Sequence, residues 1–180
     1  MRIQENHAHA DTKYKALTLV DFYRLLKNIV ETKQKKYTSL TVHLPYELQH
    51  PHIFHNKKLG NFYIKFGELF KKILGINLVW ENAPALVVGK WSLAYGQTNF
   101  DNIPTNVNLC LDTGHLMLSS KNPEKTISTY LKRFGKQIKH IHLHENDLKT
   151  DQHIPPSKYL NKKLVKEIIH GRTWIIEKPD

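Results

Sequence analysis

Side chains able to bind a metal recur through this sequence at nearly constant spacing. The intervals are 34, 38, 31, 30 and 35 residues, and the six residues are His9, His43, Glu81, Asp112, His142 and Glu177. Imidazoles and carboxylates gathered in one place repel one another or lose hydration unless they bind a cation. Nitrogen and oxygen donors without a thiolate suit Zn, Mn, Mg, Co or Fe rather than Cu(I). The residue types therefore predict a site for a divalent metal.

Two local patterns add donors to this series. In Asp112-Thr-Gly-His115, a second donor follows shortly after the first, and Gly114 permits a tight turn between them. In Asp151-Gln-His153, two donors stand at positions i and i+2, so both can point the same way from an extended segment. We expect His115, Asp151 and His153 to lie near the main series.

Short runs of apolar and β-branched residues lead into these donors and are predicted to be strands. The runs cover residues 39–44, 76–81, 107–112, 138–144 and 173–177, with a weaker candidate at residues 2–9. Apolar residues at helical spacing lie between them, within residues 19–30, 62–73, 127–134 and 160–169, and Ser157 is expected to cap the last helix. Alternating strands and helices predict a parallel sheet, whose strands present their carboxyl ends at one face.

Length and composition narrow the fold and exclude several classes of protein. The chain has 180 residues, which suits one domain over residues 1–180 but is short for an eight-fold βα barrel of about 250 residues. One cysteine, Cys110, excludes a disulfide framework and a cysteine-rich zinc module, and it fits a reducing cytoplasm. No apolar run approaches the ~20 residues that span a bilayer, and no signal peptide is expected.

The position of the positive charge decides what the formal net charge of +11 means. Basic residues cluster at 33–36, 71–72, 132–139 and 162–166, and three of these clusters precede strands, opposite the expected site. A DNA groove needs its cations at the mouth of the site, where the phosphates lie. Only Lys57, Lys58, Lys90, Lys149 and Lys158 are well placed for that purpose. The net charge therefore supports DNA binding less than its size suggests.

Three motifs together resemble those of the xylose isomerase-like TIM-barrel superfamily. They are Cys110-Leu-Asp-Thr-Gly-His115, His140-Ile-His-Leu-His-Glu-Asn146 and Asp151-Gln-His-Ile-Pro155. Val42-His43-Leu-Pro45 is similar to the histidine-bearing strand of that group, and His7 or His9 is similar to the preceding one. The resemblance implies an α/β fold, a (β/α) TIM-type barrel of parallel strands. Here the barrel would be incomplete, with about six strands and its first βα unit or units missing.

The superfamily includes sugar phosphate isomerases and epimerases as well as the endonuclease IV family of apurinic endonucleases. In the isomerase branch, the resemblance implies one metal on Glu81, Asp112, His142 and Glu177, with the two glutamates also moving the proton. In the nuclease branch, the same four residues join His9, His43, His115, Asp151 and His153 around three zinc ions. Glu81-Asn-Ala-Pro84 and His153-Ile-Pro-Pro156 lack the glycines of the nuclease motifs, which favours the isomerase branch.

We therefore predict a metal-dependent sugar or sugar-phosphate isomerase or epimerase, with Glu81 and Glu177 as catalytic residues. The alternatives are an apurinic-site DNA phosphodiesterase with a zinc cluster and a barrel remnant without catalysis. One tightly held metal and at most one weaker are expected. The substrate contacts are expected from Trp91, Lys90 and Lys149, with Lys158 as a further phosphate-binding candidate. His140 and His144 share a strand face with His142, so either could replace it as a ligand. An open barrel exposes two strand edges, so either the chain is a fragment or a reduced form of a barrel, or a partner such as a second copy of the chain covers the gap.

Overall fold

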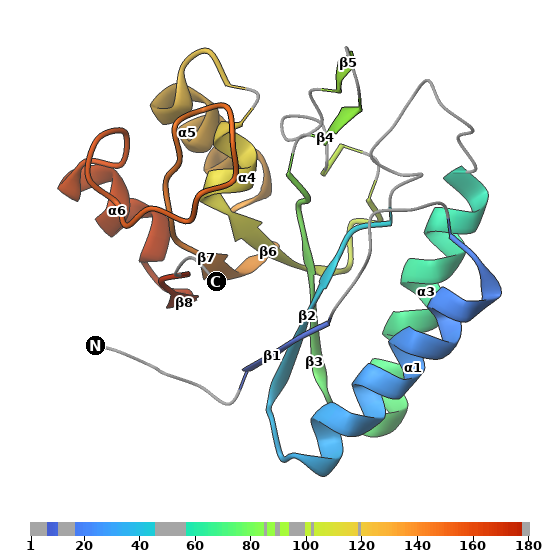
Figure 1. Cartoon of the computed structure of the whole chain (residues 1–180). Helices are drawn as coiled ribbons and strands as arrows, with labels where there is room; N and C mark the ends of the chain where they lie inside the picture. The colour runs from blue at the N-terminus through green and yellow to red at the C-terminus, as the bar shows by residue number, and fades with distance from the viewer. Residues whose placement is uncertain are drawn as a thin grey trace. The chain divides into compact units, whose positions relative to one another are not determined.

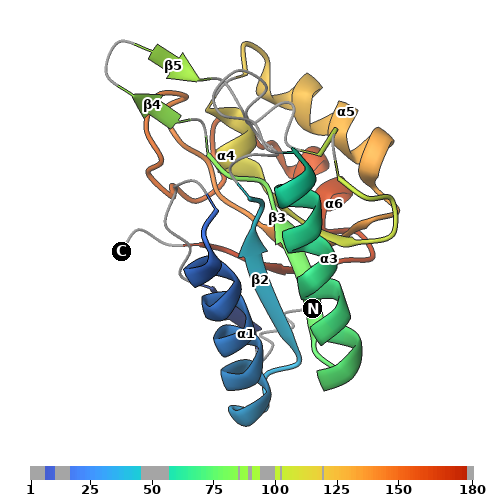
Figure 2. The ribbon, with the colours of Figure 1, turned by 90° about the vertical axis from the view of Figure 1, so that its right-hand side faces the viewer.

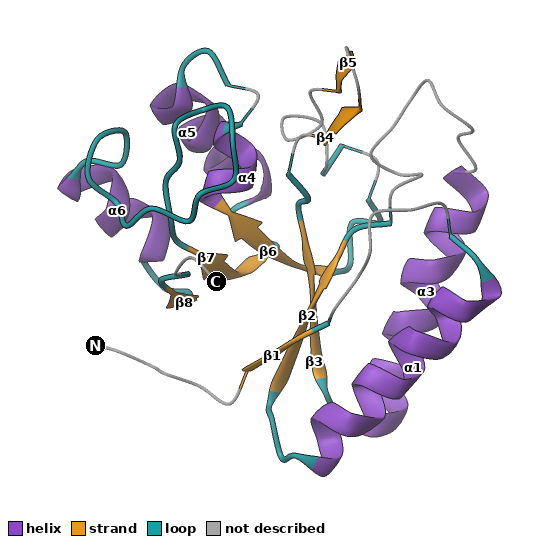
Figure 3. Ribbon diagram, in the orientation of Figure 1, coloured by secondary structure: helices purple, strands orange, loops and turns teal. Residues whose placement is uncertain are grey.

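The structure is a computed structural model, and it describes residues 7–10, 17–45, 57–84, 86–88, 91–93, 100–101, 103–118 and 120–177. For residues 7, 57, 86–88 and 91–93 only the backbone is described. The elements, shown in Figures 1 and 3, are β1 (His7–His9), α1 (Leu19–Gln34), β2 (Ser39–His43), α3 (Lys57–Leu74), β3 (Asn77–Glu81), β4 (Leu86–Val88), β5 (Trp91–Leu93), β6 (Asn108–Asp112), α4 (Thr113–Met117), α5 (Pro123–Phe134), β7 (Ile138–His142), α6 (Lys162–Ile169) and β8 (Thr173–Ile175).

Six parallel strands form the main sheet, in the order β1-β2-β3-β6-β7-β8. Helices alternate with these strands along the chain. This confirms the predicted α/β class and the incomplete TIM-type barrel. Each strand begins and ends within two residues of its predicted run, apart from β1, which occupies only the end of its weaker candidate. The stretch between β3 and β6 contains the antiparallel pair of β4 and β5.

The chain divides into two compact units. The first unit comprises residues 5–81 and 102–108 and contains β1, β2, β3, α1 and α3. Its three strands are parallel, and α1 and α3 lie side by side against them (Figure 2). Helix α1 begins after Thr18, whose backbone N–H donates to the Asp21 carboxylate at 2.7 Å, as in a capping box. The single domain predicted over residues 1–180 stays a prediction.

Aromatic rings join the two helices of the first unit to each other and to the sheet. Phe22 of α1 packs edge-on against Tyr63 and Phe66 of α3, with ring centroids 5.0 and 5.3 Å apart. Tyr63 in turn packs against Trp80 of β3, at 5.8 Å. Gly67 allows this approach, since a Cβ there would lie 2.9 Å from the Trp80 ring. These contacts pack α1, α3 and β3 against one another.

The second unit comprises residues 1–4, 82–101 and 109–180, of which the described part contains the helices α4 to α6, the pair of β4 and β5, and the strands β6, β7 and β8. Asp112 at the end of β6 pairs in register with His142 at the end of β7, and His142 pairs with Ile175 of β8. Helix α5 begins at Pro123, because Asn122 caps it and the proline suits its first turn.

The predicted start of the last helix at Ser157 is wrong. Helix α6 begins at Lys162, and its cap is Asn161, whose side chain accepts the Leu164 N–H. Residues 157–160 are instead bound to Glu145, whose carboxylate accepts the backbone N–H groups of Lys158 and Tyr159 at 2.8 and 2.9 Å. A tertiary contact therefore takes the backbone donors that a longer helix would have used. Within the described residues, no helix has the length and apolar character to cross a membrane.

Candidate metal centre

Three predicted ligands meet at the carboxyl ends of the strands in the first unit. His43 and Glu81 are register partners on β2 and β3, and His43 Nε2 lies 3.5 Å from a Glu81 carboxylate oxygen. His9 Nε2, at the end of β1, lies 2.9 Å from the same oxygen. The Glu81 side chain is buried. A buried carboxylate needs a positive partner, which is a protonated imidazole or a cation.

A second group of predicted ligands lies in the second unit, at the ends of β6, β7 and β8. His142 Nδ1 is 2.9 Å from a carboxylate oxygen of Glu177 and 3.7 Å from one of Asp112. The side chains of His142 and Asp112 are fully buried, whereas that of Glu177 is 19% exposed. His144 Nε2 completes this group, 2.9 Å from Asp112 and 3.6 Å from Glu177. Two carboxylates and two imidazoles thus share one largely buried space.

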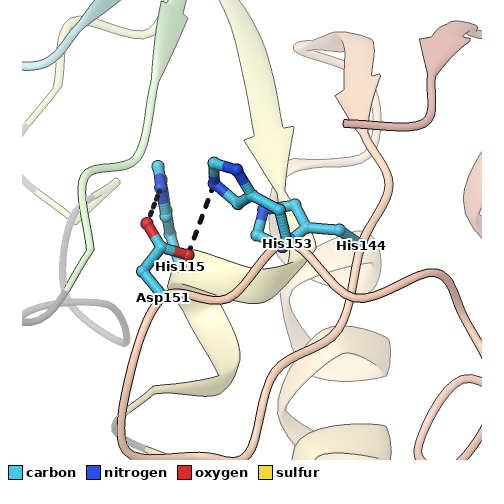
Figure 4. A group of neighbouring side chains, drawn as sticks. All are labelled: His115, His144, Asp151 and His153. Atoms are coloured by element: carbon cyan, nitrogen blue, oxygen red, sulfur yellow. Dashed lines mark hydrogen bonds and ion pairs between the residues drawn. The ribbon is translucent and has the colours of Figure 1, made fainter. Parts of the chain in front are cut away.

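A third group joins the two local patterns of the sequence and is also within the second unit (Figure 4). Asp151 lies between two imidazoles, with its carboxylate oxygens 3.1 Å from His115 Nε2 and 3.5 Å from His153 Nε2. The His144 ring lies edge-on to that of His153, with centroids 4.4 Å apart. Each of the four residues offers a ligand atom within 4.8 Å of the others. His144 is therefore a member of both groups in this unit.

The position of His115 is set by two backbone contacts. Asp112 caps helix α4 by accepting the His115 N–H at 2.7 Å, which ties this histidine to the end of β6. His115 Nδ1 lies 2.8 Å from the carbonyl oxygen of Asn82. A carbonyl only accepts, so Nδ1 carries the hydrogen and the neutral ring presents the lone pair of Nε2 to Asp151. A lone pair facing a carboxylate is unfavourable unless a proton or a metal ion lies between them.

Two distances in the third group are close to those between the ligands of a bound metal. Ligand atoms at about 2.0–2.1 Å from a tetrahedral zinc lie roughly 3.3–3.5 Å from one another. The two distances from Asp151 to its histidines, 3.1 and 3.5 Å, are close to that spacing. A metal-bound histidine also commonly donates its other N–H to a carbonyl, as His115 does to Asn82. The residues present therefore fit a divalent metal, and the nitrogen-rich third group suits zinc.

The segment that carries Asp151 and His153 is not the extended segment that the i, i+2 spacing suggested. His153 has a φ of +50°, in the left-handed region, where histidine is enriched among non-glycine residues together with asparagine and aspartate. The next residue, Ile154, forms an antiparallel bridge with Glu145. Both donors of the pattern still reach the third group, because the turn and the bridge bring them there.

Neighbouring charges shift the pKa values of two residues in the third group. Burial of the His144 ring lowers its pKa, but the charge and hydrogen bond of Asp112 outweigh burial, and the pKa of His144 lies above its ordinary value. Burial acts to raise the pKa of Asp151, but the hydrogen bond and charge of His115 lower it below its ordinary value. The site therefore favours an ionised carboxylate beside nitrogen donors that attract positive charge.

Sequence reasoning missed three residues that position the site, and it left one ligand undecided. Asn82 holds the end of β6, accepting from the Asp112 N–H at 2.8 Å and donating to the Asp112 carbonyl at 2.9 Å. Glu145 and Asn146 hold the loops beside His144 and Gly114. The alternation that made His144 an alternative to His142 leaves the choice open, because the structure brings both rings to the second group.

The predicted substrate contacts stay predictions. Lys90 lies outside the described residues, and Trp91 is described only by its backbone, in β5. Lys149 is exposed in a turn, where its backbone N–H donates to the Asp147 carboxylate at 2.8 Å. Lys158 is also exposed, with its ammonium group 4.8 Å from the centre of the Tyr159 ring.

The sequence matches no protein-family model and no curated protein. Solved structures do match. A D-tagatose 3-epimerase-like protein aligns over 96% of this chain and 70% of its own, at a TM-score of 0.70 and 17% identity. The TTHB071 protein from Thermus thermophilus, soaked with zinc chloride, aligns over the same shares, at 0.66 and 14%. Endonuclease IV from the same organism aligns over 97% of this chain and 69% of its own, at 0.58 and 12%.

The fold is that of the xylose isomerase-like TIM barrels. The comparisons confirm the resemblance that the motifs indicated, over almost the whole of this chain. The matched structures include both an epimerase-like protein and an endonuclease IV, so the likeness in fold does not choose between the two branches. At these identities the comparisons establish the fold, and the chemistry has to be argued from the residues.

Proposed function

We propose that this protein is a divalent-metal-dependent isomerase or epimerase of sugars or sugar phosphates. The observation that carries the proposal is the buried group of Asp112, His142 and Glu177 at adjacent strand ends, in which Glu177 keeps a partly exposed carboxylate. The group combines two firmly buried ligands with one side chain that can meet a substrate. The matched epimerase-like structure supports the same choice.

In this proposal the metal, once bound, polarises a carbonyl and a hydroxyl of the sugar and orients it. Asp112 and His142 hold the metal and are fixed by their pairing between β6 and β7. Glu177 removes or returns the proton at the carbon next to the carbonyl, and Glu81 is its partner in proton transfer. Lys90, Lys149 or Lys158 binds a phosphate where the substrate has one, and Trp91 stacks on the sugar.

A second candidate function is a phosphodiester hydrolase acting on apurinic sites in DNA. The third group favours it, because a three-zinc site needs the donors of His115, Asp151 and His153 as well as those at the strand ends. The group of His9, His43 and Glu81 in the first unit favours it for the same reason. Against it stand the missing glycines after Glu81 and after His153. A barrel remnant without catalysis is the third outcome.

Solvent deuterium exchange tests the leading proposal. The purified protein, loaded with Zn²⁺, Mn²⁺ or Co²⁺, is incubated in deuterated water with a panel of ketoses and ketose phosphates. We expect deuterium at the carbon next to the carbonyl, because proton removal by a carboxylate exchanges with solvent. Glu177→Gln should lose this exchange by at least about 100-fold. Glu167→Gln, an exposed glutamate of α6 in the same unit, is the matched control and should keep it.

The same preparation is assayed on a duplex with one abasic site. Cleavage of the DNA without any sugar turnover would overturn the leading proposal in favour of the hydrolase. If the protein binds metals but shows neither activity, the barrel remnant is favoured. A reducing cytoplasm as the location and a second copy of the chain as a partner stay predictions.

A further inference from the structure

His144 occupies a position between the two metal-ligand groups of the second unit. Its Nε2 lies 2.9 Å from Asp112 and its ring centroid lies 4.4 Å from that of His153. The ring is fully buried, although it belongs to a loop residue just beyond the end of β7. The resemblance to known families implies a metal ligand at His142, at the strand end. It implies no role for His144.

The surrounding chain is built to hold this ring. The Thr113 hydroxyl donates to the His144 carbonyl at 2.7 Å and accepts from the His144 N–H at 3.0 Å. A Cβ on Gly114 would lie 2.0 Å from the ring, so the glycine leaves the space that the imidazole fills. Asn146 then fixes this glycine by donating to its carbonyl at 2.8 Å. The contacts of the His144 backbone and the space around its side chain thus fix the position of the ring.

Counting donors shows what the ring can supply. His115, Asp151 and His153 give three, and a zinc ion held by protein alone in a closed site has four, in a tetrahedron. His144 offers a nitrogen within 4.8 Å of the other three ligand atoms. The rings of His115 and His153 lie 5.9 and 4.4 Å from it, and both pairs are T-shaped. These four side chains supply the number of donors that a closed tetrahedral site requires.

We infer that His144 is the fourth ligand of a closed zinc site formed with His115, Asp151 and His153. With four protein ligands this metal has no position left for substrate, so its role is structural. It would hold the loop of residues 145–160 against the end of β7. The inference rests on the proposed function for the neighbouring group of Asp112, His142 and Glu177, which then keeps the open metal. The inference implies a second tightly held ion, whereas the sequence predicted one.

Cobalt substitution tests the inference without using activity. Tetrahedral Co²⁺ absorbs visible light strongly, whereas five- and six-coordinate Co²⁺ absorbs weakly. We expect the wild-type protein to develop the strong band as Co²⁺ is added, and His144→Asn to lose that band. The variant should also bind this metal more than about 100-fold more weakly, since even a partner outside the ligand shell costs about 10–100-fold. His170→Asn, an exposed histidine of the same unit, is the matched control and should keep both properties.

Two further variants separate the sites. Asp151→Asn should reproduce the loss of the strong band, whereas Glu177→Gln should keep it. If His144→Asn keeps the band and loses the metal that Glu177→Gln loses, His144 belongs to the other group and the inference is overturned. A wild-type protein that shows only weak absorption overturns it too, and this result does not depend on any variant folding. A protein with the His144-dependent band but no turnover supports the inference and rejects the proposed function.

Discussion

Glu145 and Ile154 form an antiparallel bridge in which each backbone N–H donates to the carbonyl of the other residue, at 2.6 and 2.8 Å. The bridge places His153 beside the end of β7. The Glu145 carboxylate adds to it by accepting the backbone N–H groups of Lys158, Tyr159 and Leu160. One buried glutamate therefore organises the loop that carries two donors of the third group.

Glu145→Ala should lower the free energy of unfolding by about 3 kcal/mol or more. The substitution leaves several buried or partly buried N–H donors without an acceptor, and each costs about 1–3 kcal/mol. Urea denaturation followed by circular dichroism measures the change. Glu145→Gln keeps one acceptor oxygen and should lose less, and Glu167→Ala at the surface should change stability little. Equal stability of the alanine variant and the wild type would contradict this role.

Gly114→Ala should destabilise the protein by about 1–3 kcal/mol, because its methyl group would overlap the His144 ring. In the background of His144→Ala, the same substitution should instead stabilise by up to about 1 kcal/mol, since alanine is the better helix former and the ring is absent. A double-mutant cycle on the free energy of unfolding measures this change of sign. Additive effects would show that the glycine is not there to make room for the ring.

Alkaline stability should depend on Tyr63, which is buried between α1 and the sheet. Burial, followed by the negative charge of Asp21, raises the pKa of its phenol above the ordinary value of 10.0. The folded state keeps the proton while the unfolded chain loses it. The contribution to stability is therefore complete below pH 10.0, and it falls as the pH rises towards the folded pKa.

The loss should be about 1.4 kcal/mol near pH 11 and should be absent in Tyr63→Phe. Urea denaturation at neutral pH and near pH 11 gives the free energy of unfolding at each pH. The change between the two pH values is then compared for the wild type and Tyr63→Phe. Tyr23→Phe, a change at an exposed tyrosine of α1, should lose as much stability as the wild type. An equal loss in Tyr63→Phe and the wild type would contradict the assignment.

The regular spacing of donors allowed the strand ends to be predicted, because each βα unit returns the chain to the same edge of a parallel sheet. Asp112 and His142 could be placed side by side from the sequence for this reason. The choice between His142 and His144 could not be made, because period two continues past the strand end and does not show where the strand stops. The structure ends β7 at His142 and still buries His144.

Residues that act through long-range backbone contacts escaped sequence reasoning altogether. Asn82 binds both backbone groups of Asp112, 30 residues away, and nothing in its own sequence neighbourhood indicates that partner. Ser157 was predicted to cap a helix because the local sequence does not show that Glu145 binds the residues after it. Local preference predicted the elements, and tertiary hydrogen bonds decided the loops.

The number of metal ions bound per chain should depend on His153, which contacts Asp151 and His144 in the third group. His153→Ala removes one nitrogen donor, so we expect elemental analysis to find one metal equivalent fewer per chain than in the wild type, both purified without chelator. A bound metal stabilises the folded state by about 2.7 kcal/mol at 100 times its Kd. A chelator should therefore lower the melting temperature of the wild type more than that of the variant. His170→Ala controls for the loss of a histidine. Three zinc equivalents falling to two would favour the nuclease function, whereas an unchanged count would show that His153 binds no metal.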